Sequence, residues 1–211
     1  MKPLPHPPDS PWTIRSSTPV YANPWIKVTE HDVLTPAQTP GIYGTVIFQS
    51  SAVGVIAVDD AGHTWLVGQY RFPLERYSWE LPEGGCPLDE TPLEAAKREL
   101  AEECGLAADC WRLLLQMDLS NSVTNETAAV FIATGLTALG ETNHEDTEDL
   151  RIHRLPLREA FDRVRTGELR DSMTVAGLTR LELELLRSPG TPLSALGQPA
   201  PTGPLPPPPG T

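Results

Sequence analysis

The hydrophobic and polar positions along the chain change period several times. Alternating or β-branched segments at 12–21, 25–34 and 43–49 predict three strands of an N-terminal meander. Segments 51–58 and 64–72, joined by the turn sequence DDAG, predict a β-hairpin. Further strand character follows at 110–119 and 127–136, and an acidic loop separates these from the segment 150–157. This succession of strands and helices predicts an α/β fold with a mixed sheet, preceded by antiparallel strands.

Three segments have helical periodicity. The first, 91–104, begins with Thr91 as N-cap, Pro92 in the first turn and Glu94 in a capping box, and Gly105 ends it. Two more helices are expected at 157–166 and 171–187, the second with a leucine stripe. The sequence thus divides into a meander at 12–48 and an α/β domain at 49–187.

Proline-rich sequence forms both ends of the chain. Residues 1–11 and 188–211 are expected to be disordered or polyproline-like, because proline removes backbone donors and favours extended backbone. The closing PLPPPPG is either a solvated tail or a ligand for a partner that binds polyproline.

Composition and charge argue against some classes of binding partner. A formal net charge of -12 argues against a surface that follows nucleic-acid phosphates. The sequence has no apolar run of membrane-spanning length. The three cysteines match no zinc spacing, so a reduced cytoplasmic protein is expected.

The first helix carries an unusual concentration of glutamates. Glu99, Glu102 and Glu103 stand at i, i+3 and i+4, so their carboxylates converge on one face although like charges repel there. Hard divalent cations bind carboxylate oxygens together with water and substrate phosphates, which would relieve that repulsion. Arg98 is placed to restrain a carboxylate, either Glu102 or Glu90.

The stretch from Gly84 to Leu106 resembles the box of the Nudix hydrolases at every defined position: Gly84, Glu90, Arg98, Glu99, Leu100, Glu102, Glu103, Gly105 and Leu106. The resemblance implies a Nudix fold, an α/β/α sandwich, and a Mg²⁺ cofactor for which Mn²⁺ substitutes. By it, Glu99, Glu103 and the backbone carbonyl of Glu83 would bind metal, while Glu102 would bind another metal or its water. Glu90 and Arg98 would pair to hold the loop, with Gly84 and Gly105 as structural positions.

The approach to the box, GQYRFPLERYSWELPEGG, resembles the ADP-ribose pyrophosphatase group. That resemblance makes Arg71 and Glu80 candidate substrate-binding residues, with Arg71 contacting a phosphate, shaping a dimer interface or forming a surface ion pair. Trp79 is interpreted as a packing residue rather than a base-stacking one. Glu145 and Glu148 are both candidates for the mobile general base, Glu148 being better aligned, although either could be a solvated charge.

In that group the N-terminal strands form a homodimer, and Trp25 or Tyr43 would either stack on a base or pack in the core. The expected reaction is Mg²⁺-dependent cleavage of ADP-ribose to AMP and ribose 5-phosphate. Because the loop LSNSVTNE lacks the proline typical of the group, other nucleoside diphosphate sugars remain an alternative. A non-catalytic nucleotide-binding Nudix module is the alternative from another class.

Overall fold

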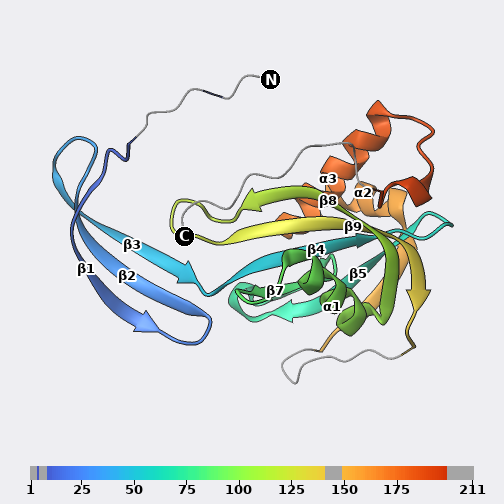
Figure 1. The fold of residues 1–211 in the computed structure, drawn as a ribbon, viewed down its shortest axis with the longest axis horizontal. Helices are drawn as coiled ribbons and strands as arrows, with labels where there is room; N and C mark the ends of the chain where they lie inside the picture. Colours follow the sequence, from blue (N-terminus) through green and yellow to red (C-terminus); the bar gives the residue numbers. More distant parts are fainter. Residues whose placement is uncertain (1–3, 5–8, 141–148, 199–211) are drawn as a thin grey trace. The chain divides into compact units, whose positions relative to one another are not determined.

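The computed structural model describes residues 4, 9–140 and 149–198, which form two compact units (Figure 1). The first comprises residues 1–50 and 118–126, and the second comprises residues 51–117 and 127–211. The division falls close to the expected boundary at residue 48. The loop at 118–126 belongs to the first unit although it lies far along the chain.

The first unit is an antiparallel sheet in the order β1-β2-β3. Its strands are β1 (Thr13–Ala22), β2 (Ile26–Leu34) and β3 (Pro40–Phe48). The meander expected at 12–48 is therefore present. Every residue of β1 is exposed, and Val46 of β3 donates its backbone N–H to the carbonyl of Val123 in the loop.

The second unit has two sheets, ordered β7-β4-β9-β8 and β10-β5-β6. Their strands are β4 (Ser50–Ala57), β5 (His63–Arg71), β6 (Arg76–Glu80), β7 (Glu83–Pro87), β8 (Leu106–Asp118), β9 (Thr127–Ala138) and β10 (Arg151–Pro156). The helices are α1 (Pro92–Cys104), α2 (Leu157–Arg165) and α3 (Ser172–Arg187), with short 3₁₀ turns η1 (Phe72–Leu74) and η2 (Leu193–Ala195). All three α-helices lie where the hydrophobic period predicts them.

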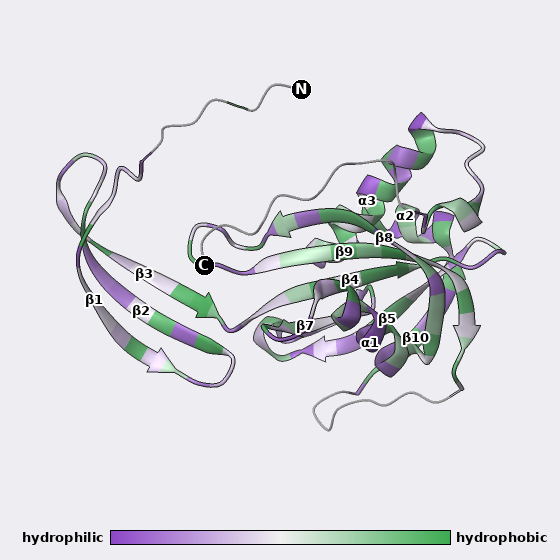
Figure 2. Ribbon diagram, viewed as in Figure 1, coloured by the Kyte–Doolittle hydropathy of each residue, from purple (hydrophilic) through white to green (hydrophobic). Residues whose placement is uncertain are grey.

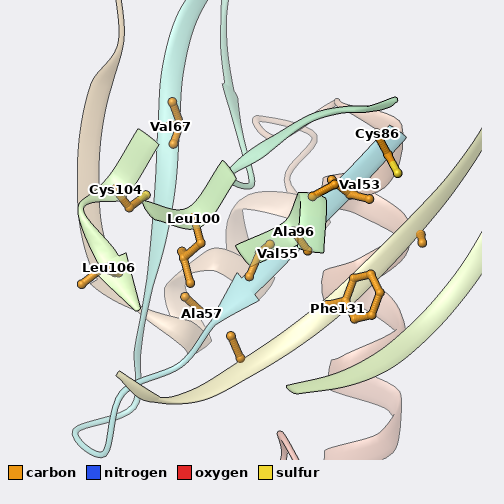
Figure 3. Close-up of a cluster of buried hydrophobic side chains, with 13 residues drawn as sticks. Val53, Val55, Ala57, Val67, Cys86, Ala96, Leu100, Cys104, Leu106 and Phe131 are labelled. Atoms are coloured by element: carbon orange, nitrogen blue, oxygen red, sulfur yellow. The ribbon is translucent and has the colours of Figure 1, made fainter. Parts of the chain in front are cut away.

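Helices cover both faces of the parallel pair β4 and β9. Val53 and Val55 of β4 pack with Ala96 and Leu100 of α1, as Figure 3 shows. On the other face, a Cβ on Gly177 of α3 would lie within 3.0–3.5 Å of side chains from β4, β9 and the β6–β7 connection. Strands buried on both faces are mainly apolar where they are buried, as the hydropathy colouring of β4 and β9 reflects (Figure 2). The expected mixed-sheet α/β/α architecture is therefore confirmed.

The predicted hairpin of 51–58 and 64–72 is wrong in its pairing. The turn forms, since Gly62 donates its backbone N–H to the carbonyl of Asp59. However, β4 lies between β7 and β9, whereas β5 lies between β10 and β6. The local sequence encodes the turn, but the partners of each strand come from distant parts of the chain.

The C-terminal tail begins later than the sequence predicts. Residues 188–198 pack on the second unit through η2, with Leu196 buried. Arg112 donates its Nε–H to the Leu196 carbonyl at 2.7 Å. The boundary at residue 188 is therefore wrong for residues 188–198, because an apolar anchor follows the prolines.

The sequence led to expectations about the cysteines and about membrane-spanning segments. Cys86, Cys104 and Cys110 are free thiols. No helix in the described ranges is long and apolar enough to cross a membrane.

Candidate active site

Helix α1, which carries the glutamates, is capped at both ends. Thr91 accepts a hydrogen bond from the Glu94 backbone N–H, and Glu94 accepts one from Thr91, which completes the capping box. At the other end Gly105 adopts a left-handed conformation with φ 63°. The apolar face of α1 is buried, so Glu99 and Glu103 are carried into the domain and both are buried.

Arg98 gathers the carboxylates around one guanidinium. Its Nη1 donates to Glu99 Oε1 at 2.7 Å and to Glu102 Oε2 at 3.0 Å. Its Nε and Nη2 donate to the two oxygens of Glu90, at 3.3 and 3.0 Å, and Nη2 also donates to the Gly85 carbonyl at 2.8 Å. Hydrogen bonds with Glu90, then with Glu99 and Glu102, raise the pKa of Arg98. Arg98 therefore contacts both Glu102 and Glu90, the two partners considered for it.

Two backbone contacts join α1 to β7. A Cβ on Gly84 would overlap the Glu99 carboxylate, so a side chain at this position would displace that carboxylate. The Glu83 backbone N–H donates to Glu103 Oε2 at 2.9 Å. The two α1 carboxylates expected to bind metal therefore both lie against the strand that carries the Glu83 carbonyl.

The donor set of this group fits a hard divalent cation. It consists of oxygen atoms only, from the side chains of Glu99, Glu102 and Glu103 and the Glu83 carbonyl. Arg98 already pairs with Glu99, and the Glu83 N–H donates to Glu103; a cation would add to this compensation of two buried charges. The close approach of Gly84 leaves the Glu99 carboxylate directly over the β7 backbone.

Arg71, at the end of β5, and Glu80, at the end of β6, are in direct contact. Arg71 Nε donates to Glu80 Oε2 at 2.9 Å and Oε1 at 3.1 Å, and Nη2 donates to Glu83 Oε1 at 3.0 Å. Burial acts to lower the pKa of Arg71, but Glu80, Glu83 and Asp171 together raise it. Because Glu80 is buried, this pair is not a simple surface ion pair.

Two further acidic side chains lie beside this pair, and the sequence did not identify them as part of the site. The Glu83 side chain and Asp171, the N-cap of α3, both lie beside Glu80. Burial first, then the charges of Asp171 and Glu80, raise the pKa of Glu83 well above its ordinary value. Asp171 could be recognised only as a helix cap, since its sequence neighbourhood gives no sign of the site.

The remaining candidates have different outcomes. Glu145 and Glu148 lie outside the described residues. Trp79 contacts the rings of Tyr77 and His153, with centroids 5.7 and 5.8 Å away. This agrees with its interpretation as a packing residue.

The two aromatic candidates of the first unit also differ. Tyr43 packs edge-on against Trp12, with ring centroids 5.2 Å apart, and donates its hydroxyl to the Ser122 carbonyl. Trp25 is 71% exposed, so core packing within its own chain is wrong for this residue. Its side chain is available to contact another molecule.

The amino-acid sequence of the chain is similar to two known protein families and to characterised relatives. The NUDIX domain matches residues 49–173, more than half of the chain, and the nucleoside diphosphate sugar hydrolase N-terminal domain matches residues 12–46. An ADP-ribose pyrophosphatase of Mycobacterium tuberculosis is 38% identical over 136 residues, which cover 63% of this chain and 65% of that protein. An ADP-ribose pyrophosphatase of Bacillus subtilis is 31% identical over 140 residues, which cover 66% of this chain and 76% of that protein.

A solved structure described as an ADP compounds hydrolase has a TM-score of 0.76 with this chain, at 22% sequence identity. The alignment covers 85% of this chain and 97% of the other. This likeness concerns the fold.

Proposed function

Because the chain belongs to the Nudix family, we propose that it is a Mg²⁺-dependent pyrophosphohydrolase that cleaves the diphosphate of ADP-ribose, giving AMP and ribose 5-phosphate. The observation that carries this proposal is the group of α1 carboxylates that Arg98 and the β7 backbone hold together. The pyrophosphatases named above, aligned over about two thirds of this chain, support ADP-ribose as the substrate.

In this proposal Glu99, Glu103 and the Glu83 carbonyl hold the metal, and Glu102 holds a second ion or its water. A divalent cation bound there would neutralise the diphosphate and lower the pKa of the attacking water. The chain's own contribution is to fix the ligands in advance: Glu90 restrains Arg98, and Gly84 allows Glu99 to reach the β7 backbone. Mn²⁺ is expected to substitute for Mg²⁺.

Arg71 and Glu80 are proposed to bind substrate. Two carboxylates hold Arg71 in place while 35% of its side chain stays exposed, so a phosphate oxygen can reach its remaining donors. In this arrangement Glu80 orients the guanidinium rather than meeting the anionic diphosphate directly.

The general base is proposed to be Glu148, with Glu145 as the alternative. Glu148→Gln should lower kcat while leaving the affinity for Mn²⁺ unchanged. If Glu145→Gln has that effect instead, the assignment moves to Glu145.

A broader activity on nucleoside diphosphate sugars is the second candidate. The match of residues 12–46 to the nucleoside diphosphate sugar hydrolase N-terminal domain favours it. The loop at 119–126, which lacks the proline of the ADP-ribose group, also favours it.

We also propose that the first unit makes the protein a homodimer. Strand β1 is exposed along its whole length, and apolar side chains such as Ile14, Val20 and Tyr21 project from it. Light scattering should give twice the chain mass of 23.0 kDa. A monomer at micromolar concentration would refute this arrangement.

The deciding experiment offers the purified chain a panel of ADP-ribose, other nucleoside diphosphate sugars and nucleoside triphosphates with Mg²⁺ or Mn²⁺. Chromatography of the nucleotide products is the readout. The proposal expects AMP from ADP-ribose and no turnover in chelator. Tight binding of ADP-ribose without product would instead indicate the non-catalytic module.

A further inference from the structure

Three carboxylates from separate elements meet beside the α1 group. They belong to Glu80 of β6, Glu83 of β7 and Asp171 at the start of α3, and one oxygen of each lies within 4.8 Å of the others. We call this set the triad. None of its side chains belongs to the α1 group, although the Glu83 backbone touches Glu103.

The charge of the triad is only partly compensated. Arg71 forms ion pairs with Glu80 and Glu83, and within the described ranges the triad has no other ion pair. With all three carboxylates ionised, as they would be around a bound cation, one guanidinium leaves two negative charges. Glu80 and Glu83 are both largely removed from water, with side chains 4% and 7% exposed, so uncompensated charge there is costly.

One buried oxygen atom in the triad faces another carboxyl group rather than an N–H or hydroxyl donor. Glu83 Oε1 accepts from Arg71, but Glu83 Oε2 is buried and receives no N–H or hydroxyl hydrogen in the described part of the chain; its polar neighbour is the carboxyl group of Asp171. Buried polar atoms are nearly always satisfied, and a common explanation for an exception is a bound ion or water. The position of this oxygen is therefore consistent with a bound cation that oxygen atoms coordinate.

We propose that the triad binds one divalent cation through oxygens of Glu80, Glu83 and Asp171, separately from any ion held by the α1 glutamates. A charge of two would balance the two remaining negative charges. The spacing permits this, because oxygens that share an ion with bonds of about 2.4 Å lie no more than about 4.8 Å apart. The all-oxygen donor set selects Mg²⁺, Mn²⁺ or Ca²⁺ over softer metals.

Such an ion would have a structural consequence for the neighbouring group. It would join β6, β7 and the first turn of α3, and would fix the residue whose N–H is bound by Glu103. Asp171 keeps its role as N-cap, since its Oδ2 accepts from the Thr174 N–H at 2.8 Å. The other Asp171 oxygen can then serve the ion.

The test counts Mn²⁺ ions bound to the chelator-treated full chain by electron paramagnetic resonance titration. Asp171→Asn preserves the helix cap, because asparagine caps as well as aspartate does, and Glu83→Gln preserves size. Each variant should bind one fewer Mn²⁺ per chain, or bind that ion at least about tenfold more weakly. Asp60→Asn, at an exposed turn acid, should bind as the unchanged chain does.

A second measurement separates the triad from the α1 group. In the double variant Glu99→Gln/Glu103→Gln, millimolar Mn²⁺ should still raise the melting temperature, and adding Asp171→Asn should abolish that rise. The proposal is overturned if both Asp171→Asn and Glu83→Gln fold and bind as many Mn²⁺ ions as the unchanged chain. It is also overturned if the α1 double variant shows no Mn²⁺ response. Loss of ADP-ribose hydrolysis alone would count against the proposed function and leave this count unaffected.

Discussion

At the scale of single residues, the packing of Gly84 against Glu99 links backbone shape to the proposed chemistry. A Cβ at position 84 has no room, since the Glu99 carboxylate occupies that volume. The Glu99 carboxylate in turn is held by Arg98. A side chain at position 84 would therefore act on the α1 carboxylates rather than on the fold as a whole.

We expect Gly84→Ala to lower the rate of ADP-ribose hydrolysis at least about hundredfold, by displacing Glu99 from its place on β7. Initial rates and Mn²⁺ titration measure the effect. Gly44→Ala is the matched control, because a Cβ there meets nothing within 4 Å. Equal rates in the two variants would contradict the placement of Glu99 in the site.

Glu103 gives the second prediction at this scale. Glu103→Gln removes a buried charge that faces the Glu83 N–H, and it should lower kcat at least about hundredfold. Asp89→Asn, an exposed residue of the same loop-helix segment, should retain full activity. Near-normal turnover by the Glu103 variant would rule out its role as a metal ligand.

At the scale of elements, α1 is specified at both ends by its own sequence. The capping box at Thr91 and the left-handed Gly105 fix where the helix begins and ends. The buried face of the helix then decides which glutamates enter the domain. Stability of this one helix therefore affects the whole group of carboxylates.

Thr91→Ala should cost about 1 kcal/mol of stability, because the Glu94 backbone N–H loses its side-chain acceptor. For a chain of this size that corresponds to a fall in melting temperature of about 2–4 °C. Thr91→Ser keeps the capping hydroxyl and should melt close to the unchanged chain. Calorimetry of the three proteins provides the comparison, and an alanine variant as stable as the serine variant would refute the capping role.

At the scale of the whole molecule, the residues that follow α3 belong to the folded second unit. Residues 188–198 include η2 and the buried Leu196, and Arg112 binds both the Leu196 carbonyl and Glu184 of α3. This segment is part of the folded second unit. The proline-rich sequence beyond it lies outside the described residues.

Two truncations test whether residues 188–198 contribute to the stability of the fold. Removing residues 199–211 should leave melting temperature and turnover unchanged. Removing residues 188–211 should lower the melting temperature by several degrees, because burial of Leu196 and the Arg112 contact are lost. If both truncations melt alike, the packing of residues 188–198 contributes nothing to stability.

Much of the fold could be predicted because its signals are local. Period, caps and turn residues identified α1, α2 and α3 and most strands within a few residues of their bounds. The pairing of β4 and β5 was wrong because a turn sequence does not determine which strands become neighbours in a sheet. The order β7-β4-β9-β8 depends on contacts between distant segments.

The same distinction applies to the candidate site. The spacing of Glu99, Glu102 and Glu103 placed them on one helix face from the sequence alone, and the resemblance supplied the pairing of Glu90 with Arg98, which the structure contains. The roles of these residues, the cytoplasmic location and the general base remain predictions. The neighbours of Arg71, in contrast, come from β6, β7 and α3.

By itself, the sequence determined the helices, the turns and a convergent set of glutamates, because each depends on residues within a few positions of one another. Only the tertiary structure decided that Gly84 lies against Glu99, that Asp171 joins Glu80 and Glu83, and that Leu196 returns to the core. Those contacts join residues far apart in the chain, and packing of the sheets and helices is what brings them within reach.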